Sequence, residues 1–196
     1  VLGGLLSNDE PTLDSYKFTH SSMQAAEKYG AKIVSGRVTG LVCGRRQGHS
    51  AGVTLEDGSM LEGGSVLLAM GPWTGAASAW TGSTLPIAPQ RGQLLYLSEP
   101  DNRHDVGVES GFSTVEVPVS IIRKRLSENL LGSTREDVGF DVSTTVSARE
   151  LLMSQFAMLS DRADSIGISA QTACLRPVTP DGRPYVGRAP LWDNVY

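Results

Sequence analysis

The spacing of apolar residues first changes from irregular to helical near residue 15. We expect a helix from Ser15 to Tyr29, because one face collects apolar and small residues while the other is polar. Asp14 is a candidate N-cap for this helix, and Gly30 is placed to end it. The face expected to pack in a core consists of Phe18, Ser22, Ala25, Ala26 and Tyr29.

Strand patterns dominate the remainder of the first half. Short apolar or alternating runs predict strands over residues 1–6, 31–34 and 37–43, and a hairpin over 53–61 with Asp57-Gly58 at its turn. The run from Ser65 to Met70 is continuously apolar, as expected of a strand buried on both faces. A helix is expected to follow, with Pro72 in its first turn and Trp73 and Trp80 anchored in the core.

The second half predicts a second sheet. Two prolines, Pro86 and Pro89, precede a strand-like run over 92–97, and we place a change of domain within residues 85–97. Further strands are expected over 114–122 and 128–132, with a helix over 147–159. Arg91 lies at the start of this region, and we interpret it as a structural ion-pair partner, with contact to a substrate as the alternative.

The segment from Thr172 to Pro190 is rich in proline and glycine and cannot form a long helix. Thr172–Leu175 is expected to be a short buried strand that delivers Arg176 to a turn at Pro180-Asp181-Gly182. An arginine beside a rigid turn suits the binding of a planar anion. The alternative is a solvated arginine on an ordinary surface turn.

Composition narrows the classes of function. The chain has 196 residues, of which 40% are hydrophobic, and a net charge of −4, which argues against a nucleic-acid-binding surface. No apolar run approaches the roughly 20 residues of a membrane span. Clustered metal ligands are absent from the sequence, which argues against a metal hydrolase. Cys43 and Cys174 are too few for a disulfide framework, which favours a reducing, cytoplasmic location.

Four motifs together resemble the FAD-dependent D-amino-acid-oxidase superfamily, and glycine oxidases and related amino- and imino-acid dehydrogenases in particular. They occur in the family's order and the resemblance covers essentially the whole chain. The motifs are A-M-G-P-W at 69–73, P-Q-R-G-Q at 89–93, L-G-S-T-R-E-D-V-G-F-D at 131–141 and L-R-P-V-T-P-D-G-R-P-Y-V-G at 175–187.

The resemblance implies an α/β fold. Part of a Rossmann-like parallel FAD-binding sheet with its helices is expected beside a largely antiparallel substrate domain. Residues 1–84 would belong mainly to the FAD-binding domain, with a substrate-domain strand near 1–6 and a β-meander over 37–62. Residues 85–175 would form the substrate domain, and 176–196 would return to the FAD-binding domain. The family's N-terminal G-x-G-x-x-G unit and its C-terminal segment do not occur in these residues. We therefore expect the chain alone to be inactive and unable to hold FAD tightly.

The resemblance also assigns a function. It implies oxidation of the C–N bond of a small amino or imino acid, by hydride transfer to flavin N5 and hydrolysis of the resulting imine. Arg176 would clamp the substrate carboxylate. The positions that it implies for FAD binding are Val38, Ala69, Gly71, Trp73, Gly182 and Gly187.

Several alternatives stay open. The pattern at 117–124, V-P-V-S-I-I-R-K, departs from the Y-x-x-P-R of glycine oxidases and resembles dehydrogenase subunits of heteromeric complexes. Partner subunits or a homo-oligomer are therefore possible, as is a non-catalytic or electron-relaying subunit, or a flavin-free substrate-binding module. Cys174 lies where monomeric sarcosine oxidases carry a covalent flavin bond, but we interpret it as a packed, inert thiol.

Overall fold

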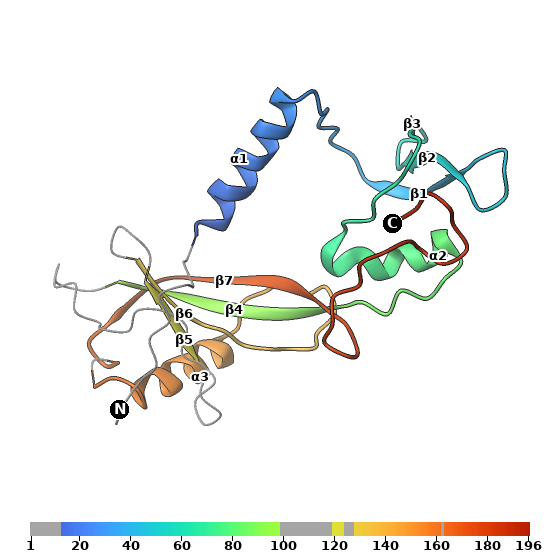
Figure 1. Cartoon of the computed structure of the whole chain (residues 1–196). Coiled ribbons are helices and arrows are strands. Elements are labelled where there is room, and N and C mark those ends of the chain that lie inside the picture. Colours follow the sequence, from blue (N-terminus) through green and yellow to red (C-terminus); the bar gives the residue numbers. More distant parts are fainter. Residues whose placement is uncertain (1–12, 99–118, 124–127, 162) are drawn as a thin grey trace. The chain divides into compact units, whose positions relative to one another are not determined.

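The computed structural model describes residues 13–98, 119–123, 128–161 and 163–196 (Figure 1). The chain divides into two compact units: unit 1 combines residues 1–22 with 91–175, and unit 2 combines residues 23–90 with 176–196. The strand expected over 1–6 lies outside the described residues, as does most of the one expected over 114–122. None of the described helices has the length and apolar character needed to cross a membrane.

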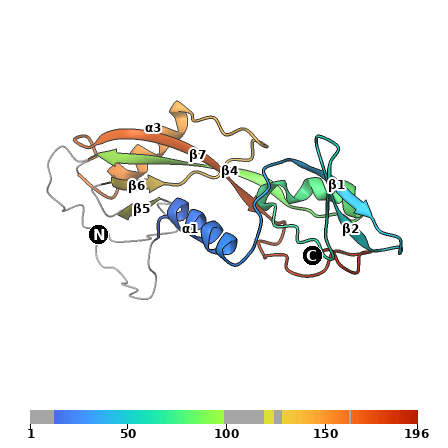
Figure 2. The ribbon, with the colours of Figure 1, turned by 90° about the horizontal axis from the view of Figure 1, so that it is seen from above.

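Unit 1 is built on a four-stranded sheet in the order β5-β6-β4-β7 (Figure 2). Its central strand β6 runs antiparallel to both β4 and β5, so that Leu131 lies opposite Leu95 on one side and Ile121 on the other. The antiparallel sheet predicted for this half of the chain is therefore confirmed. Its strands are β4 (Ala88–Ser98), β5 (Ser120–Arg123), β6 (Glu128–Gly132) and β7 (Gly167–Val178); residues 88–90 of β4 and 176–178 of β7 belong to unit 2.

Helix α3 (Val146–Ala157) packs on this sheet and contributes Leu152 and Phe156 to the core. Alternate residues of a strand point to the same face, so one face of the sheet collects the leucines and isoleucines that meet the helix. Thr145 caps α3, because its Oγ1 accepts a hydrogen bond from the backbone N–H of Ala148 at 3.2 Å. The core consists of Leu95, Leu97, Val119, Ile121, Leu131, Leu152, Phe156 and Ala163.

Strand β7 is longer and more exposed than the sequence predicts. It forms an edge of the sheet and continues through Arg176 and Pro177 to Val178, so Arg176 lies within the strand. An edge strand tolerates Pro177, because a missing backbone N–H on the open side costs no ladder hydrogen bond. The prediction of a short buried strand ending at Leu175 was therefore wrong in both length and burial.

Unit 2 contains a three-stranded antiparallel sheet of β1 (Val38–Cys43), β2 (Ser50–Leu55) and β3 (Met60–Glu62). The predicted turn joins β2 to β3: Gly58 has φ of +82°, and Oδ1 of Asp57 accepts the N–H of Ser59 at 2.9 Å. This confirms the β-meander. The short strand predicted over 31–34 is not formed; those residues are exposed and irregular.

Close packing of β2 against β3 requires a glycine at position 52. Gly52 has φ of +144°, and a Cβ built there would lie 2.0 Å from the carbonyl oxygen of Leu61. Neither the backbone angle nor the contact admits a larger residue.

The apolar run at 65–70 differs from its prediction. It pairs in parallel with the last residues through a bridge between Val66 and Val195, and Leu67 is 75% exposed. Asn194 fixes this pairing from a buried position. Its Oδ1 accepts the backbone N–H of Ser50 at 2.8 Å, and its Nδ2 donates to the carbonyls of Ser50 and Gly64. The parallel arrangement is present, but the expected burial on both faces is wrong.

The helix expected after Gly71 is a 3₁₀ helix, η1 (Gly71–Ala77), followed by one turn of α-helix, α2 (Ser78–Thr81). Pro72 occupies its first turn as predicted and is buried. Trp73, however, is 54% exposed, which corrects the expectation that it anchors this helix in the core.

The structure confirms the predicted ends of helix α1 (Ser15–Lys28) but not the predicted burial of its apolar face. Oδ1 of Asp14 accepts the N–H of Lys17 at 3.0 Å, and Gly30 ends the helix with φ of +94°. None of its residues is buried, and Phe18 and Tyr29 are 61% and 88% exposed. The amphipathic pattern predicts the helix correctly, but it does not show which surface packs against its apolar face. No described part of the chain covers that face.

Candidate functional site

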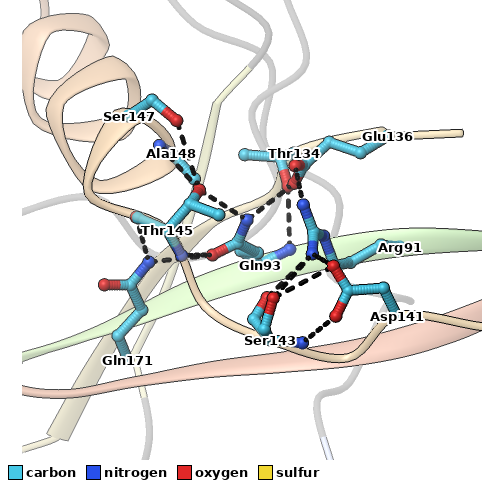
Figure 3. Close-up of polar contacts among 10 residues, drawn as sticks. All are labelled: Arg91, Gln93, Thr134, Glu136, Asp141, Ser143, Thr145, Ser147, Ala148 and Gln171. Atoms are coloured by element: carbon cyan, nitrogen blue, oxygen red, sulfur yellow. Dashed lines mark hydrogen bonds and ion pairs between the residues drawn. The ribbon is translucent and has the colours of Figure 1, made fainter. Parts of the chain in front are cut away.

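Two of the motifs meet in unit 1. Strand β4 carries P-Q-R-G-Q, and the chain that leaves β6 carries the segment from Gly132 to Asp141. Arg91 and Glu136 form an isolated antiparallel bridge, each donating its backbone N–H to the other's carbonyl at 2.9 Å. The bridge sets the side chains of these segments against one another (Figure 3).

The guanidinium of Arg91 lies at the centre of this cluster and is 5% exposed. Its Nη2 pairs with Oε2 of Glu136 at 2.7 Å, and its Nη1 pairs with Oδ2 of Asp141 at 2.6 Å. Nη1 also donates to the carbonyl of Ser143 at 3.0 Å. A buried guanidinium needs such paired acceptors, because an unpaired buried charge is strongly destabilising. The ion-pair role predicted for Arg91 is confirmed.

Gln93 is fully buried two residues further along β4. Its Nε2 donates to Oε1 of Glu136 at 2.9 Å and to Oγ1 of Thr145 at 3.1 Å. Its Oε1 accepts the backbone N–H of Thr145 and Nε2 of Gln171, both at 2.9 Å. All four hydrogen-bonding positions of the amide are filled, so this side chain joins β4, β7, the loop after β6 and the start of α3 (Figure 3).

The electrostatics of this cluster favour permanent charges. Burial raises the pKa of Glu136, but hydrogen bonds from Arg91, Thr134 and Gln93 outweigh it and leave that pKa below its ordinary 4.5. Hydrogen bonds from Ser143, aided by the charge of Arg91, lower the pKa of Asp141 below 3.8. The hydrogen bond to Glu136 raises the pKa of Arg91. No proton is exchanged among these groups near neutral pH, so the cluster is a polar brace rather than an acid–base catalyst.

Unit 2 contains all the residues to which the resemblance assigned a role. Arg176 is half-buried in β7, just before the turn in which Gly182 donates its N–H to the carbonyl of Thr179 at 3.1 Å. Val38 is half-buried as the first residue of β1, whereas Ala69 is exposed. These positions come from separate segments of unit 2.

Glycine backbone is open at three of the positions assigned to FAD. Gly71, Gly182 and Gly187 have φ of +53°, +69° and +150°, and a Cβ built at any of them would find nothing within 4 Å. Trp73 is 54% exposed beside the first of them. Open glycine backbone next to an exposed aromatic ring allows the close approach that a flavin nucleotide requires. The residues present therefore fit bound FAD.

A comparison with known protein families matches residues 1–196 to DAO, described as FAD dependent oxidoreductase. The chain belongs to this family. It is 31% identical over 163 residues to the glycine oxidase of Pseudomonas putida, which covers 81% of the chain and 42% of that protein. It is 31% identical over 197 residues to the D-amino acid dehydrogenase of Xanthobacter autotrophicus, covering 100% of the chain and 45% of that protein.

Solved structures share the fold of this DAO chain. The L-proline dehydrogenase of P. horikoshii superposes with a TM-score of 0.81 at 20% identity, covering 92% of the chain and 48% of that protein. The chain spans less than half the length of the relatives it matches. The α/β fold class with FAD as the family's cofactor, expected from the motifs, is confirmed.

Sequence reasoning missed the Gln93 network. In the sequence, Gln93 stands out only as the last residue of the P-Q-R-G-Q motif, which indicates no hydrogen-bonding role. Its partner Thr145, three residues before Ala148, does carry a recognisable N-cap signal. Nothing in the sequence marked Gln171, because a half-buried glutamine in a strand has no local pattern. Cys174 also differs from its prediction: it is exposed, so it is not a packed thiol.

Proposed function

We propose that the protein containing this chain is an FAD-dependent enzyme that oxidises the C–N bond of a small amino or imino acid. The observation that carries the proposal is the family match over the whole chain, residues 1–196. The names of two relatives, a glycine oxidase and a D-amino acid dehydrogenase, support the substrate class. FAD supplies the hydride acceptor of such a reaction, and the protein supplies binding and orientation.

In this proposal Arg176 binds the substrate carboxylate. A guanidinium offers two parallel N–H donors that match a planar carboxylate. Its place in β7, stiffened by Pro177, supports this role, because a strand holds a side chain more firmly than a loop does. The substrate amine arrives neutral, so that its nitrogen lone pair forms the C=N bond as the Cα hydride leaves, and water then hydrolyses the imine.

The same proposal places FAD against unit 2. Gly71, Gly182 and Gly187 would offer backbone to the cofactor, and Ala69 and Trp73 would border it. Val38 would present its backbone to the adenine end. The open space around the three glycines supports this assignment.

Steady-state kinetics of the full-length protein test the proposal. Glycine, D-alanine and L-proline are supplied as substrates, with oxygen uptake measured in one series and reduction of an artificial electron acceptor in the other. Absence of turnover with every amine in both series would contradict the proposed reaction. Turnover in only one series shows whether the reduced flavin passes its electrons to oxygen or to another electron acceptor.

The role of Arg176 is tested with the same assay. Arg176→Ala should lose about 2–4 kcal/mol of transition-state binding, and Arg176→Lys should mainly raise KM, because lysine keeps the charge but not the fork. Arg183→Ala, at an exposed position of the same segment, is the matched control and should leave kcat/KM unchanged. An unchanged kcat/KM in Arg176→Ala would exclude the role.

A further inference from the structure

A cleft in unit 1 lies where the start of β5, the end of β6 and α3 meet. It has a volume of about 340 Å³ and is bordered by Ser120, Ser133, Arg135, Leu151 and Gln155, among others. This volume is at the small end of the range for ligand pockets, so the cleft suits a molecule of a few heavy atoms.

The brace described above holds the backbone of Arg135. Its neighbour Thr134 accepts the backbone N–H of Gln93 at 2.9 Å through its Oγ1. Its other neighbour, Glu136, is bonded through its backbone to Arg91 on β4, with both N–H to carbonyl distances at 2.9 Å. Arg135 therefore extends from a short segment that is fixed on both sides, which reduces the backbone entropy lost when the site binds a ligand.

The charge of Arg135 is available to a ligand. Glu136 directs its carboxylate to Arg91, Thr134 and Gln93 instead of to Arg135. In the ranges that the structure describes, no ion pair joins Arg135 to a carboxylate, and its side chain is exposed at the cleft. A planar guanidinium in this position matches the geometry of a carboxylate.

The other residues that line the cleft indicate the chemistry of the rest of the ligand. Ser120, Ser133 and Gln155 add polar groups, and Leu151, which is 49% exposed, adds an apolar wall. Among the described residues that line the cleft, Arg135 is the one that carries a positive charge, so this part of the site suits a single negative charge better than a doubly charged phosphate. Polar and apolar walls together favour a carboxylate with a short aliphatic part.

We propose that this cleft binds a small aliphatic monocarboxylate, with the carboxylate on Arg135 and the hydrocarbon part against Leu151. This site is formed by different residues from those of the substrate site proposed for Arg176. It does not depend on the reaction proposed above, because the binding requires neither FAD nor turnover.

Isothermal titration calorimetry of the full-length protein with 3-methylbutanoate tests the proposal. 3-Methylbutanamide has the same shape without the charge and should bind at least about tenfold more weakly, because it cannot form the charge-assisted pair. Arg135→Gln should weaken 3-methylbutanoate binding by about tenfold or more. Arg149→Gln, an exposed arginine on α3 whose Nε bonds to Gln171, is the matched control and should retain the wild-type affinity.

Further variants separate this site from others. Leu151→Asn should weaken 3-methylbutanoate binding but leave acetate binding unchanged, and circular dichroism confirms that each variant is folded. Binding that is lost in Arg176→Ala but retained in Arg135→Gln would overturn the inference and support the carboxylate role of Arg176. Absence of heat from the wild-type protein, or equal affinity for the acid and the amide, would also overturn it.

Discussion

Replacement of Gln93 by leucine tests whether the polar brace stabilises unit 1. Leucine has nearly the same volume and is apolar, so the change removes the hydrogen bonds without opening a cavity. Gln93 is fully buried, and its amide makes four hydrogen bonds of 2.9–3.1 Å. Of its partners, the backbone N–H of Thr145 has no second acceptor within the described residues.

The magnitude follows from what each partner retains. A stranded buried donor costs about 1–3 kcal/mol, and the lower part of this range applies to the part-buried N–H of Thr145. Glu136 keeps Arg91, and Gln171 keeps the carbonyl of Thr145, so these partners lose only the net value of one bond. With part of the loss offset by the apolar burial of leucine, we expect a decrease of about 3 kcal/mol in the free energy of unfolding.

Urea unfolding followed by circular dichroism at 222 nm measures this change. With an m-value of about 2 kcal/mol/M, the midpoint should fall by about 1.5 M. Hydrogen exchange should also accelerate at residues 145–149, where α3 begins. Gln24→Leu, on the exposed surface of α1, is the control and should leave the midpoint unchanged. A Gln93→Leu protein with the wild-type midpoint and exchange pattern would refute the reasoning.

Two further predictions concern other contacts. Gly52→Ala should lower the free energy of unfolding by about 2 kcal/mol more than Gly58→Ala. Both glycines have positive φ, but only at Gly52 would the added Cβ also meet a carbonyl oxygen. Equal losses of stability in thermal melts of the two variants would contradict this close approach. The lowered pKa of Glu136 predicts stability that is complete above pH 4.5 and is lost as pH falls through the lower, folded-state pKa. The difference in unfolding free energy between wild type and Glu136→Gln should therefore be largest above pH 5 and shrink as the pH falls below 4.5, with the exposed Glu150→Gln as control. A difference that is independent of pH would contradict this assignment.

Local chemistry made several features predictable. Asp14 and Gly30 bound α1, Asp57-Gly58 turns the hairpin, and Gly182 accepts the φ of +69° needed in its turn. Each of these depends on a few adjacent residues, whose side chains and backbone angles decide the local conformation. The same holds for β4 and β6, because short apolar runs bounded by polar residues favour strands.

Burial and long-range pairing could not be obtained in this way. The apolar face of α1 and the run at 65–70 had the patterns of buried elements, yet Tyr29 and Leu67 are 88% and 75% exposed. A pattern shows which face can be buried, but the neighbouring surface decides whether it is.

The sequence by itself determined the two ends of α1, the turn between β2 and β3 and, through its motifs, the family. Only the tertiary structure decided which polar residues act together. Gln93 and Gln171 are separated by 78 positions in the chain, and their side chains meet at 2.9 Å. No local preference encodes such a contact, because it follows from the order β5-β6-β4-β7 and from the loop that carries Thr145 onto that sheet. Once the fold buries these groups, hydrogen bonding becomes obligatory, since an unpaired polar group inside a protein is costly.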